Sequence, residues 1–266
     1  MERLLMMRLQ VQGCTAEVLI NGIPMGRACA PAGSLCLPVH EYLIEGENEL
    51  TLVIEPGPLG VARISSAPVV ADGLVGATMR LLLPRIGHIG NEALARTVAE
   101  IAWAVPDGDV YDAPLDVSRS VALPLKFPRW RWLDVPVIQD VDAHRPLVSV
   151  FLQKIAADLM RGNVQALLTA SRMRLEELAL AYQTPVADLV LRLTSRLQML
   201  HATKALKLVV PNAQEIVLRP CANGRLLECL GSNGVPALRT LPTPDGVSSA
   251  WPARVAVLNG HCHILR

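Results

Sequence analysis

The stretch VLINGIPMGRACAPAGSLCLPVHEYLIEGENELTLVI, from Val18 to Ile54, decides the fold of the first half of the chain. Asn21-Gly22 stands where a two-residue hairpin turn is expected, because both residues tolerate positive φ. Gly46-Glu47-Asn48 precedes an alternation of apolar and polar residues over Leu50–Ile54, which is typical of a half-buried strand. The stretch therefore predicts short strands joined by tight turns.

The same patterns continue to about residue 135. Strands are expected at Leu5–Val11, Glu17–Ile20, Ser34–Leu37, Glu49–Ile54, Val61–Ser66, Thr78–Leu83, Thr97–Val105 and Val117–Leu125. Proline and glycine separate these segments, as in Pro56-Gly57-Pro58. Residues 1–135 are thus predicted to form an all-β sandwich.

The periodicity changes in residues 136–266, where apolar residues recur at helical spacing. A first helix is expected to carry Pro146 in its first turn and to run to Arg161, with apolar residues four apart at Leu147, Phe151, Ile155 and Leu159. Gly162-Asn163 is expected to end it and to cap a second helix, which reaches Tyr182. A third helix follows Thr184-Pro185.

Strand patterns return after His201. They cover Ala205–Val210, Glu215–Arg219, Arg225–Leu230, Ala237–Leu241, Arg254–Leu258 and His261–Leu265. Asn223-Gly224 and Asn259-Gly260 have the preferred sequence of hairpin turns. The predicted fold class is mixed: an all-β sandwich in residues 1–135, then an α+β domain in residues 136–266 with three helices packed on a curved antiparallel sheet.

Composition limits the classes of function. Apolar residues make up 51% of the 266 residues, so the chain can build a sizeable core, and aromatic residues make up 3%. The net charge of +1 gives no global signature of binding to nucleic acid or to an anionic membrane. Residues 1–140 carry 11 basic and 16 acidic side chains, and residues 141–266 carry 14 and 8. The two parts either have different solvated surfaces or present a basic surface to an anionic partner.

Six cysteines are scattered without a C-x-x-C pair or the spacing of a zinc site. They are typical of small buried apolar residues in a reducing compartment. The first residues lack the features of a signal peptide, and no run approaches the length of a membrane span. We therefore expect a soluble, cytoplasmic protein.

Three segments of the first part resemble the galactose-binding-like jelly roll. They are the turn at Asn21-Gly22, the segment Leu37–Leu43, and Gly46–Leu52, which contains the Gly-x-Asn pattern before an alternating strand. The resemblance implies a jelly-roll sandwich. A bound sugar would need an exposed aromatic platform on that sandwich.

The order of elements in the second part is similar to the nuclear transport factor 2-like, or cystatin-like, cone. The residues that carry this similarity are Arg161–Val164 between the first two helices and the closing hairpins Asn223–Leu226 and Asn259–His261. Members of that superfamily include enzymes, small-molecule binders and interaction modules, so the resemblance does not select among these functions.

The densest unusual feature is the segment Arg129, Trp130, Arg131 and Trp132. Two indoles and two guanidinium groups at a domain junction fit a binding hot spot for a ligand or partner. The alternative interpretation is that the tryptophans plug the interface between domains. These four residues are the candidate binding site.

Other candidates are weaker. His261 and His263 lie on one face of an expected strand but lack a third metal ligand, so no metal and no cofactor are expected. His88–Glu92 could hold an acid–base pair, and Ser118 and Ser120 lack the context of a nucleophile. A basic face is suggested by Arg161, Arg172, Arg174, Arg192 and Arg196. No nucleotide-binding or hydrolase motif is present.

These observations predict a non-enzymatic binding or assembly module with a protein partner or self-association. One alternative is an enzyme or small-molecule binder that uses the concave interior of the second domain; converging polar side chains inside it would favour this alternative, and an apolar, filled interior would favour assembly. A second alternative is a carbohydrate-binding sandwich.

Overall fold

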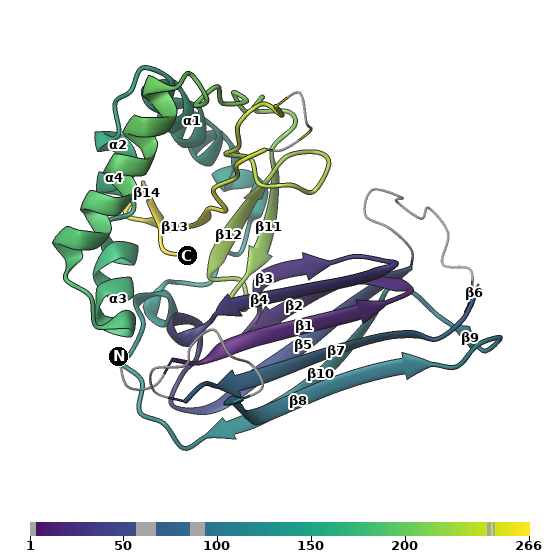
Figure 1. The fold of residues 1–266 in the computed structure, drawn as a ribbon. Coiled ribbons are helices and arrows are strands. Elements are labelled where there is room, and N and C mark those ends of the chain that lie inside the picture. The colour runs from purple at the N-terminus through teal and green to yellow at the C-terminus, as the bar shows by residue number, and fades with distance from the viewer. Residues whose placement is uncertain (1–3, 57–67, 86–93, 244–245, 247) are drawn as a thin grey trace. The chain divides into compact units, whose positions relative to one another are not determined.

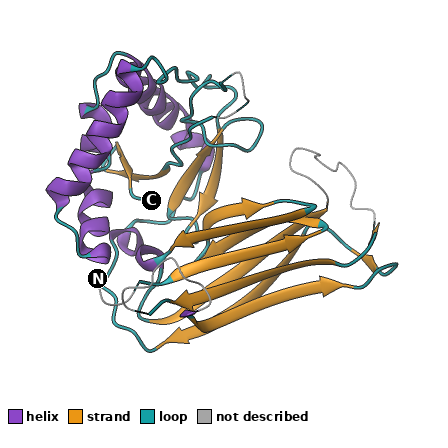
Figure 2. Ribbon diagram, viewed as in Figure 1, coloured by secondary structure: helices purple, strands orange, loops and turns teal. Residues whose placement is uncertain are grey.

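A computed structural model describes residues 4–56, 68–85, 94–243, 246 and 248–266. Within them the chain is a mixture of antiparallel sheets and four α-helices (Figures 1 and 2). The chain divides into two compact units, Met1–Arg129 and Trp130–Arg266. The division falls after Arg129 rather than after residue 135, so the tryptophan segment belongs to the second unit.

The first unit consists of two four-stranded antiparallel sheets and one two-stranded sheet. Its strands are β1 (Met6–Gln12), β2 (Cys14–Ile20), β3 (Ile23–Ala28), β4 (Ala32–Pro38), β5 (Gly46–Pro56), β6 (Val69–Val70), β7 (Val75–Leu83), β8 (Arg96–Val105), β9 (Val110–Tyr111) and β10 (Leu115–Leu123). One large sheet has the order β4-β1-β7-β8, the other β10-β5-β2-β3, and β6 pairs with β9.

Alternation along the strands builds the core between the two large sheets. On β1, Met7 and Leu9 are fully buried while Arg8 and Gln10 lie on the other face, and on β5 the expected row Leu50, Leu52 and Ile54 is fully buried. Facing strands of the two sheets, such as β1 and β2, are in contact. The hydrophobic effect therefore holds the sheets face to face.

The turns of the opening stretch form as expected and are tied together by two buried amides. Asn21-Gly22, with φ of 52° and 70°, joins β2 to β3. The Asn48 side chain accepts from the Ile44 N–H and donates to the Ile44 and Gly46 carbonyls, at 2.8 to 3.0 Å. Asn21 donates to Asn48 Oδ1 and to the Tyr42 carbonyl, both at 2.9 Å, and accepts from the Glu49 N–H. The residues that carry the jelly-roll resemblance thus have an internal, structural task.

The second unit contains four helices rather than the expected three. They are α1 (Val141–Met160), α2 (Gln165–Ala170), α3 (Arg172–Tyr182) and α4 (Val186–Ala202). The expected second helix divides at Ser171, which ends α2 and begins α3. Pro146 lies inside α1 instead of in its first turn, because Asp140 caps the helix five residues earlier than anticipated by accepting from the Asp142 and Ala143 N–H groups.

The sheet of the second unit has the order β11-β12-β13-β14. These strands are β11 (Val217–Cys221), β12 (Leu226–Leu230), β13 (Arg254–Leu258) and β14 (His261–Ile264). The expected strands over 205–210 and 237–241 are reduced to isolated bridges such as Leu208 with Thr240. Ala222 also has positive φ, so Asn223-Gly224 lies within a four-residue connection, whereas Asn259-Gly260 forms the expected two-residue turn.

One face of this sheet packs on α1. Val148, Leu152 and Ile155 of α1 are buried, and the cluster continues into the sheet through Leu227 and Val255. The space between helix and sheet is therefore filled by apolar side chains. In the part of the chain that the structure describes, no helix is both long and apolar enough to cross a membrane.

Candidate functional site

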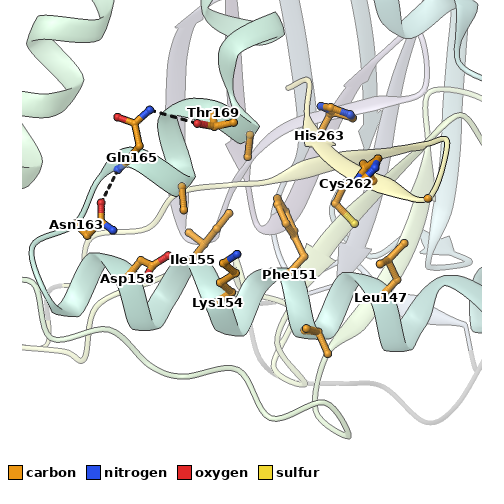
Figure 3. A pocket seen from close by; sticks show the side chains of 15 residues that line it. Leu147, Phe151, Lys154, Ile155, Asp158, Asn163, Gln165, Thr169, Cys262 and His263 are labelled. Atoms are coloured by element: carbon orange, nitrogen blue, oxygen red, sulfur yellow. Dashed lines mark hydrogen bonds between the residues drawn. The ribbon is translucent and has the colours of Figure 1, made fainter.

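A groove of about 710 Å³ lies beside α1 in the second unit (Figure 3). One side of it is a stripe of α1 side chains at helical spacing: Leu147, Val150, Phe151, Lys154, Ile155 and Asp158. Leu147 is 38% exposed and Val150 is 64% exposed. Such neighbouring apolar side chains on one helix face mark a surface that is suited to contact another molecule.

The opposite side of the groove is the edge of β14. His261, Cys262 and His263 all line the groove, although consecutive strand residues point to opposite faces of a sheet. A pocket meets three consecutive residues only if it approaches the strand from its edge. Since β14 is the terminal strand of its sheet, this edge has no neighbouring strand in the part of the chain that the structure describes.

The turn fixes which backbone groups face the groove. In a two-residue hairpin the pair that closes the turn, here Leu258 and His261, exchanges both hydrogen bonds, and the next pair exchanges none. The N–H and C=O of Cys262 therefore point away from β13. The Leu265 N–H, three residues on, donates to Arg254 on the other strand, as this alternation requires.

Short α2 closes the third side of the groove with polar groups. Gly162 follows α1 with φ of 79°, and the Asn163 side chain accepts from the Gln165 N–H at 3.0 Å, although the N-cap of α2 is Val164 and not the expected Asn163. The Gln165 side chain lies 3.4 Å from Thr169 Oγ1 (Figure 3). The first contact joins the connection after α1 to the start of α2, and the second lies within α2.

Basic and titratable groups gather at the groove. Lys154 is exposed and has no carboxylate partner among the described residues, while Asp158 pairs with Arg161 at 2.5 Å. Burial lowers the pKa of His263, and the neighbouring His261 lowers it further, so the neutral imidazole is favoured. Burial raises the pKa of Cys262 to about 11, so this thiol is a poor nucleophile.

The groove does not have the donor set of a metal centre. Within the described ranges, no group of three or more His, Cys, Asp or Glu side chains is placed to hold an ion. None of the six cysteines, all of which lie in those ranges, takes part in a disulfide bond. Burial raises the pKa of Cys221 to about 12 and also raises that of Cys229, so both remain protonated thiols.

The segment predicted as a binding site is anchored inside the second unit. Trp130 is fully buried and lies 5.6 Å below the guanidinium carbon of Arg266. The Arg131 N–H donates to Glu177 Oε1 at 2.5 Å, and its guanidinium pairs with Glu176 at 2.6 Å. Trp132 is 2% exposed.

Burial removes both tryptophans from contact with a ligand, whereas the Arg131 side chain is 46% exposed. Trp132 Nε1 has no hydrogen-bond partner among the described residues. Arg129, the fourth member, is exposed and ends the first unit. Both interpretations of the segment, a binding hot spot and a plug of the interface between the domains, remain predictions.

The other residues that the sequence suggested as candidate sites do not come together in one place among the described residues. Ser118 and Ser120 are engaged with Thr51 and Glu47 on the surface of the sandwich. His88–Glu92 lies outside the described residues. Of the arginines expected to form a basic face, Arg161 and Arg172 pair with carboxylates on their own helices.

A sugar platform on the sandwich would require an exposed aromatic ring. Trp103 lines a shallow pocket on the sheet β4-β1-β7-β8. In the register of β7 and β8, however, it stands opposite the buried Ala77 and so points to the core side, where its ring meets Tyr111 edge-on at 5.3 Å. The other aromatic side chains of this unit, Tyr42, Tyr111 and Phe127, are buried.

No family model, curated protein or solved structure matches the chain. The groove is accordingly described by its own residues. Sequence reasoning had placed Leu147, Phe151 and Ile155 on one helix face and had singled out His261 and His263 as possible metal ligands. It did not bring the two sets together, because they are about a hundred residues apart and meet only through packing of α1 on the sheet.

Proposed function

We propose that the protein is a non-enzymatic binding module whose second unit accepts an extended segment of a partner polypeptide in the groove between α1 and β14. The observation that carries this proposal is the pairing of an open strand edge with an exposed apolar helix stripe. Backbone groups on the edge offer hydrogen bonds to an added strand, and the stripe offers contacts to its alternate side chains. The apolar, filled space between α1 and the sheet also favours assembly over catalysis.

Length and charge define the segment more closely. The four residues of β14 extend about 13 Å, so they match an extended segment of similar length. Leu147, Val150 and Phe151 favour apolar side chains at every second position of that segment. Lys154 favours an acidic residue between or beside them, because its ammonium group has no carboxylate partner among the described residues and Asp158, which also lines the groove, is engaged by Arg161.

Selection from a random peptide display library tests this function. We expect enrichment of peptides that alternate apolar and acidic residues, with micromolar binding to the purified chain. Val150→Asp should weaken that binding at least tenfold, because it puts a charge into the apolar stripe. Leu191→Asp is the matched control, since Leu191 is also a helix residue and is also 64% exposed, but lies outside the groove.

Two further measurements distinguish strand addition from nonspecific binding of the peptide. N-methylation of the peptide backbone should abolish binding if the edge of β14 is used, because it removes the donating amide. The Cys262 amide should become slower to exchange with solvent when the peptide binds. The proposal fails if no sequence is enriched, or if Val150→Asp and Leu191→Asp bind the selected peptides equally. Self-association that Val150→Asp abolishes would identify a second copy of the chain as the source of the segment.

The folds of the two units are also proposed at a finer level. We infer that the first unit is a jelly-roll sandwich, supported by Asn21-Gly22 and Gly46–Asn48 at the turns where that family has them. For the second unit, the order of helices followed by an antiparallel sheet supports a nuclear transport factor 2-like cone. An experimental structure and a topology comparison with both families would test each assignment.

A further inference from the structure

A second pocket of the same unit lies under α4 and shares no lining residue with the groove. Its volume is about 270 Å³. Apolar side chains from α2, α3, α4 and the segment before β13 make up most of its lining: Leu167, Leu175, Leu178, Leu189, Leu193, Leu238, Trp251, Pro252, Ala253 and Ile264. Ser171, Arg174 and Arg196 complete it. An apolar pocket with a few polar groups at one place is the general form of a small-molecule site.

Incomplete packing of α4 creates this pocket. Leu197 is the fully buried side chain of the helix, whereas Leu191 and Met199 are more than half exposed and Leu189 and Leu193 are half-buried along the pocket. Contacts of α4 are mainly with α3 and α1. The leucines that face the pocket therefore have apolar surface that a ligand can cover.

The two arginines give the pocket its charge. Arg174 on α3 and Arg196 on α4 have no hydrogen bond or ion pair with the described residues, and none of the described residues that line the pocket is acidic. The carboxylates of α3 are engaged elsewhere, Glu176 by Arg131 and Arg172 and Glu177 by Arg266. Two guanidinium groups without an anion thus flank an apolar space.

We propose that this pocket binds a free medium-chain carboxylate, with the acyl chain among the leucines and the carboxylate between Arg174 and Arg196. The guanidinium group matches a carboxylate in two parallel hydrogen bonds, and apolar burial drives the insertion of the chain. The pocket has the liquid volume of about nine water molecules, so its occupant has on the order of ten non-hydrogen atoms. Octanoate has this size.

Titration of the full-length protein with octanoate, octan-1-ol and butyrate tests the site. The indole N–H resonance of Trp251, assigned by its loss in Trp251→Phe, reports on occupancy because Trp251 lines the pocket. Octanoate should shift this resonance with saturation. Octan-1-ol, which lacks the charge, and butyrate, which lacks the chain, should each bind at least tenfold more weakly.

Substitutions in the pocket separate the contribution of the arginine charges to ligand affinity from the contribution of the apolar side chains. Arg174→Gln and Arg196→Gln should each weaken octanoate at least tenfold and leave octan-1-ol unchanged. Arg192→Gln is the control, because Arg192 is exposed on the same helix but does not line the pocket. Leu193→Trp should fill the space and abolish binding of both compounds, while the helical circular dichroism signal is retained.

The proposal is overturned if octanoate at about 10 mM leaves the Trp251 resonance unmoved, a level that excludes even weak binding of a few kcal/mol. Equal octanoate affinity in Arg174→Gln, Arg196→Gln and the unmodified protein would also overturn it. Because the groove beside α1 shares no residue with this pocket, peptide binding in the groove is measured separately and neither result depends on the other.

Discussion

The two units fix their polar interior groups by different chemistry. At the turns of the first unit, neutral amides do so: Asn21 and Asn48 bond to each other and to the backbone of the segments around them, while the buried Glu17 on β2 pairs with Arg27. In the second unit, charges do so: Arg266, which is 1% exposed, pairs with Glu177. The comparison shows how one chain can use a salt-insensitive network in one unit and a charge-dependent one in the other.

The same contrast extends to the surfaces. The turns of the sandwich around Asn21 and Asn48 satisfy their own hydrogen-bonding groups. The second unit has an open strand edge at β14 and arginines without carboxylate partners on α3 and α4. Binding is therefore proposed for the second unit alone, and the first unit is interpreted as self-supporting.

The largest effect is expected from the double substitution Trp130→Ala, Trp132→Ala. Each buried indole costs about 3–5 kcal/mol when it is truncated to alanine, although the two losses do not simply add. Hydrogen exchange resolved along the chain measures the result in each unit. Loss of protection in 141–266 with an unchanged sandwich would indicate that the tryptophans support the second unit.

The same measurement decides whether these tryptophans plug a domain interface. Loss of protection in both units, with new proteolysis near Lys126–Arg131, would support the plug. Unchanged protection in both units would contradict support of the second unit and the plug of a domain interface alike. The binding hot spot would then remain as the interpretation of the segment, and loss of partner binding by the variant would test it.

Glu177→Gln is expected to have the next largest effect. It removes the negative charge that Arg266 faces and weakens the acceptor of the Arg131 N–H. Breaking a buried ion pair from one side costs about 3–5 kcal/mol, because the remaining charge stays buried and loses its carboxylate partner. Urea unfolding of the second unit measures this loss.

The neighbouring Glu176→Gln is its matched control. Glu176 also pairs with arginines, Arg131 and Arg172, but its side chain is 32% exposed. Exposed pairs contribute less than about 1 kcal/mol. Equal losses for Glu176→Gln and Glu177→Gln would show that burial does not decide the strength of these pairs.

Local features of the fold were predictable from the sequence, and the contacts between distant residues were not. Asn21-Gly22 and Asn259-Gly260 were identified as turns because the requirement for positive φ is set by two adjacent residues. β3 was not predicted, since Pro24 and Gly26 obscure its alternation and a register shift interrupts its pairing with β2. The break at Ser171 was missed because apolar residues continue at helical spacing through it.

The candidate site was predictable only in parts for the same reason. The helical spacing of Leu147 and Phe151 was visible, as were His261 and His263, but their meeting depends on how α1 crosses the sheet. The tryptophan segment attracted attention by its composition. Composition does not reveal burial, and Trp130 is fully buried.

Asn48→Ala tests how much the neutral amide network contributes to the stability of the first unit. It removes a fully buried side chain and leaves the Asn21 amide and the part-buried backbone groups of Ile44 and Gly46 without this partner. The expected loss is about 2–3 kcal/mol, since an unsatisfied buried group costs about 1–3 kcal/mol and some relaxation is possible. Hydrogen exchange of β2 and β5 measures it, and high salt should not change it.

Thr51→Ala is the control on the same strand. Its hydroxyl meets Ser118 at 2.8 Å on the exposed face, so the change should stay within about 0.5 kcal/mol. A loss for Asn48→Ala as small as that for Thr51→Ala would mean that water replaces the amide in the turn, and the network would then not fix the first unit.

The smallest effect concerns pH and His40 of the first unit. Its Nδ1 is buried without a hydrogen-bond partner among the described residues, and its ring lies 4.9 Å from that of Phe127. Burial lowers the pKa of His40 below its ordinary value of 6.5. Above pH 6.5 both the folded and unfolded states are neutral at this residue, and stability does not depend on it. As the pH falls below 6.5 the unfolded state binds the proton first, so the free energy of unfolding decreases until the folded-state pKa is passed.

Hydrogen exchange of the sandwich, corrected for intrinsic rates between pH 5 and 8, should show this decrease, and His40→Leu should remove it. A decrease that persists in His40→Leu would assign the acid sensitivity of the first unit to other groups, and its neutral network would then be less independent of charge than the comparison implies.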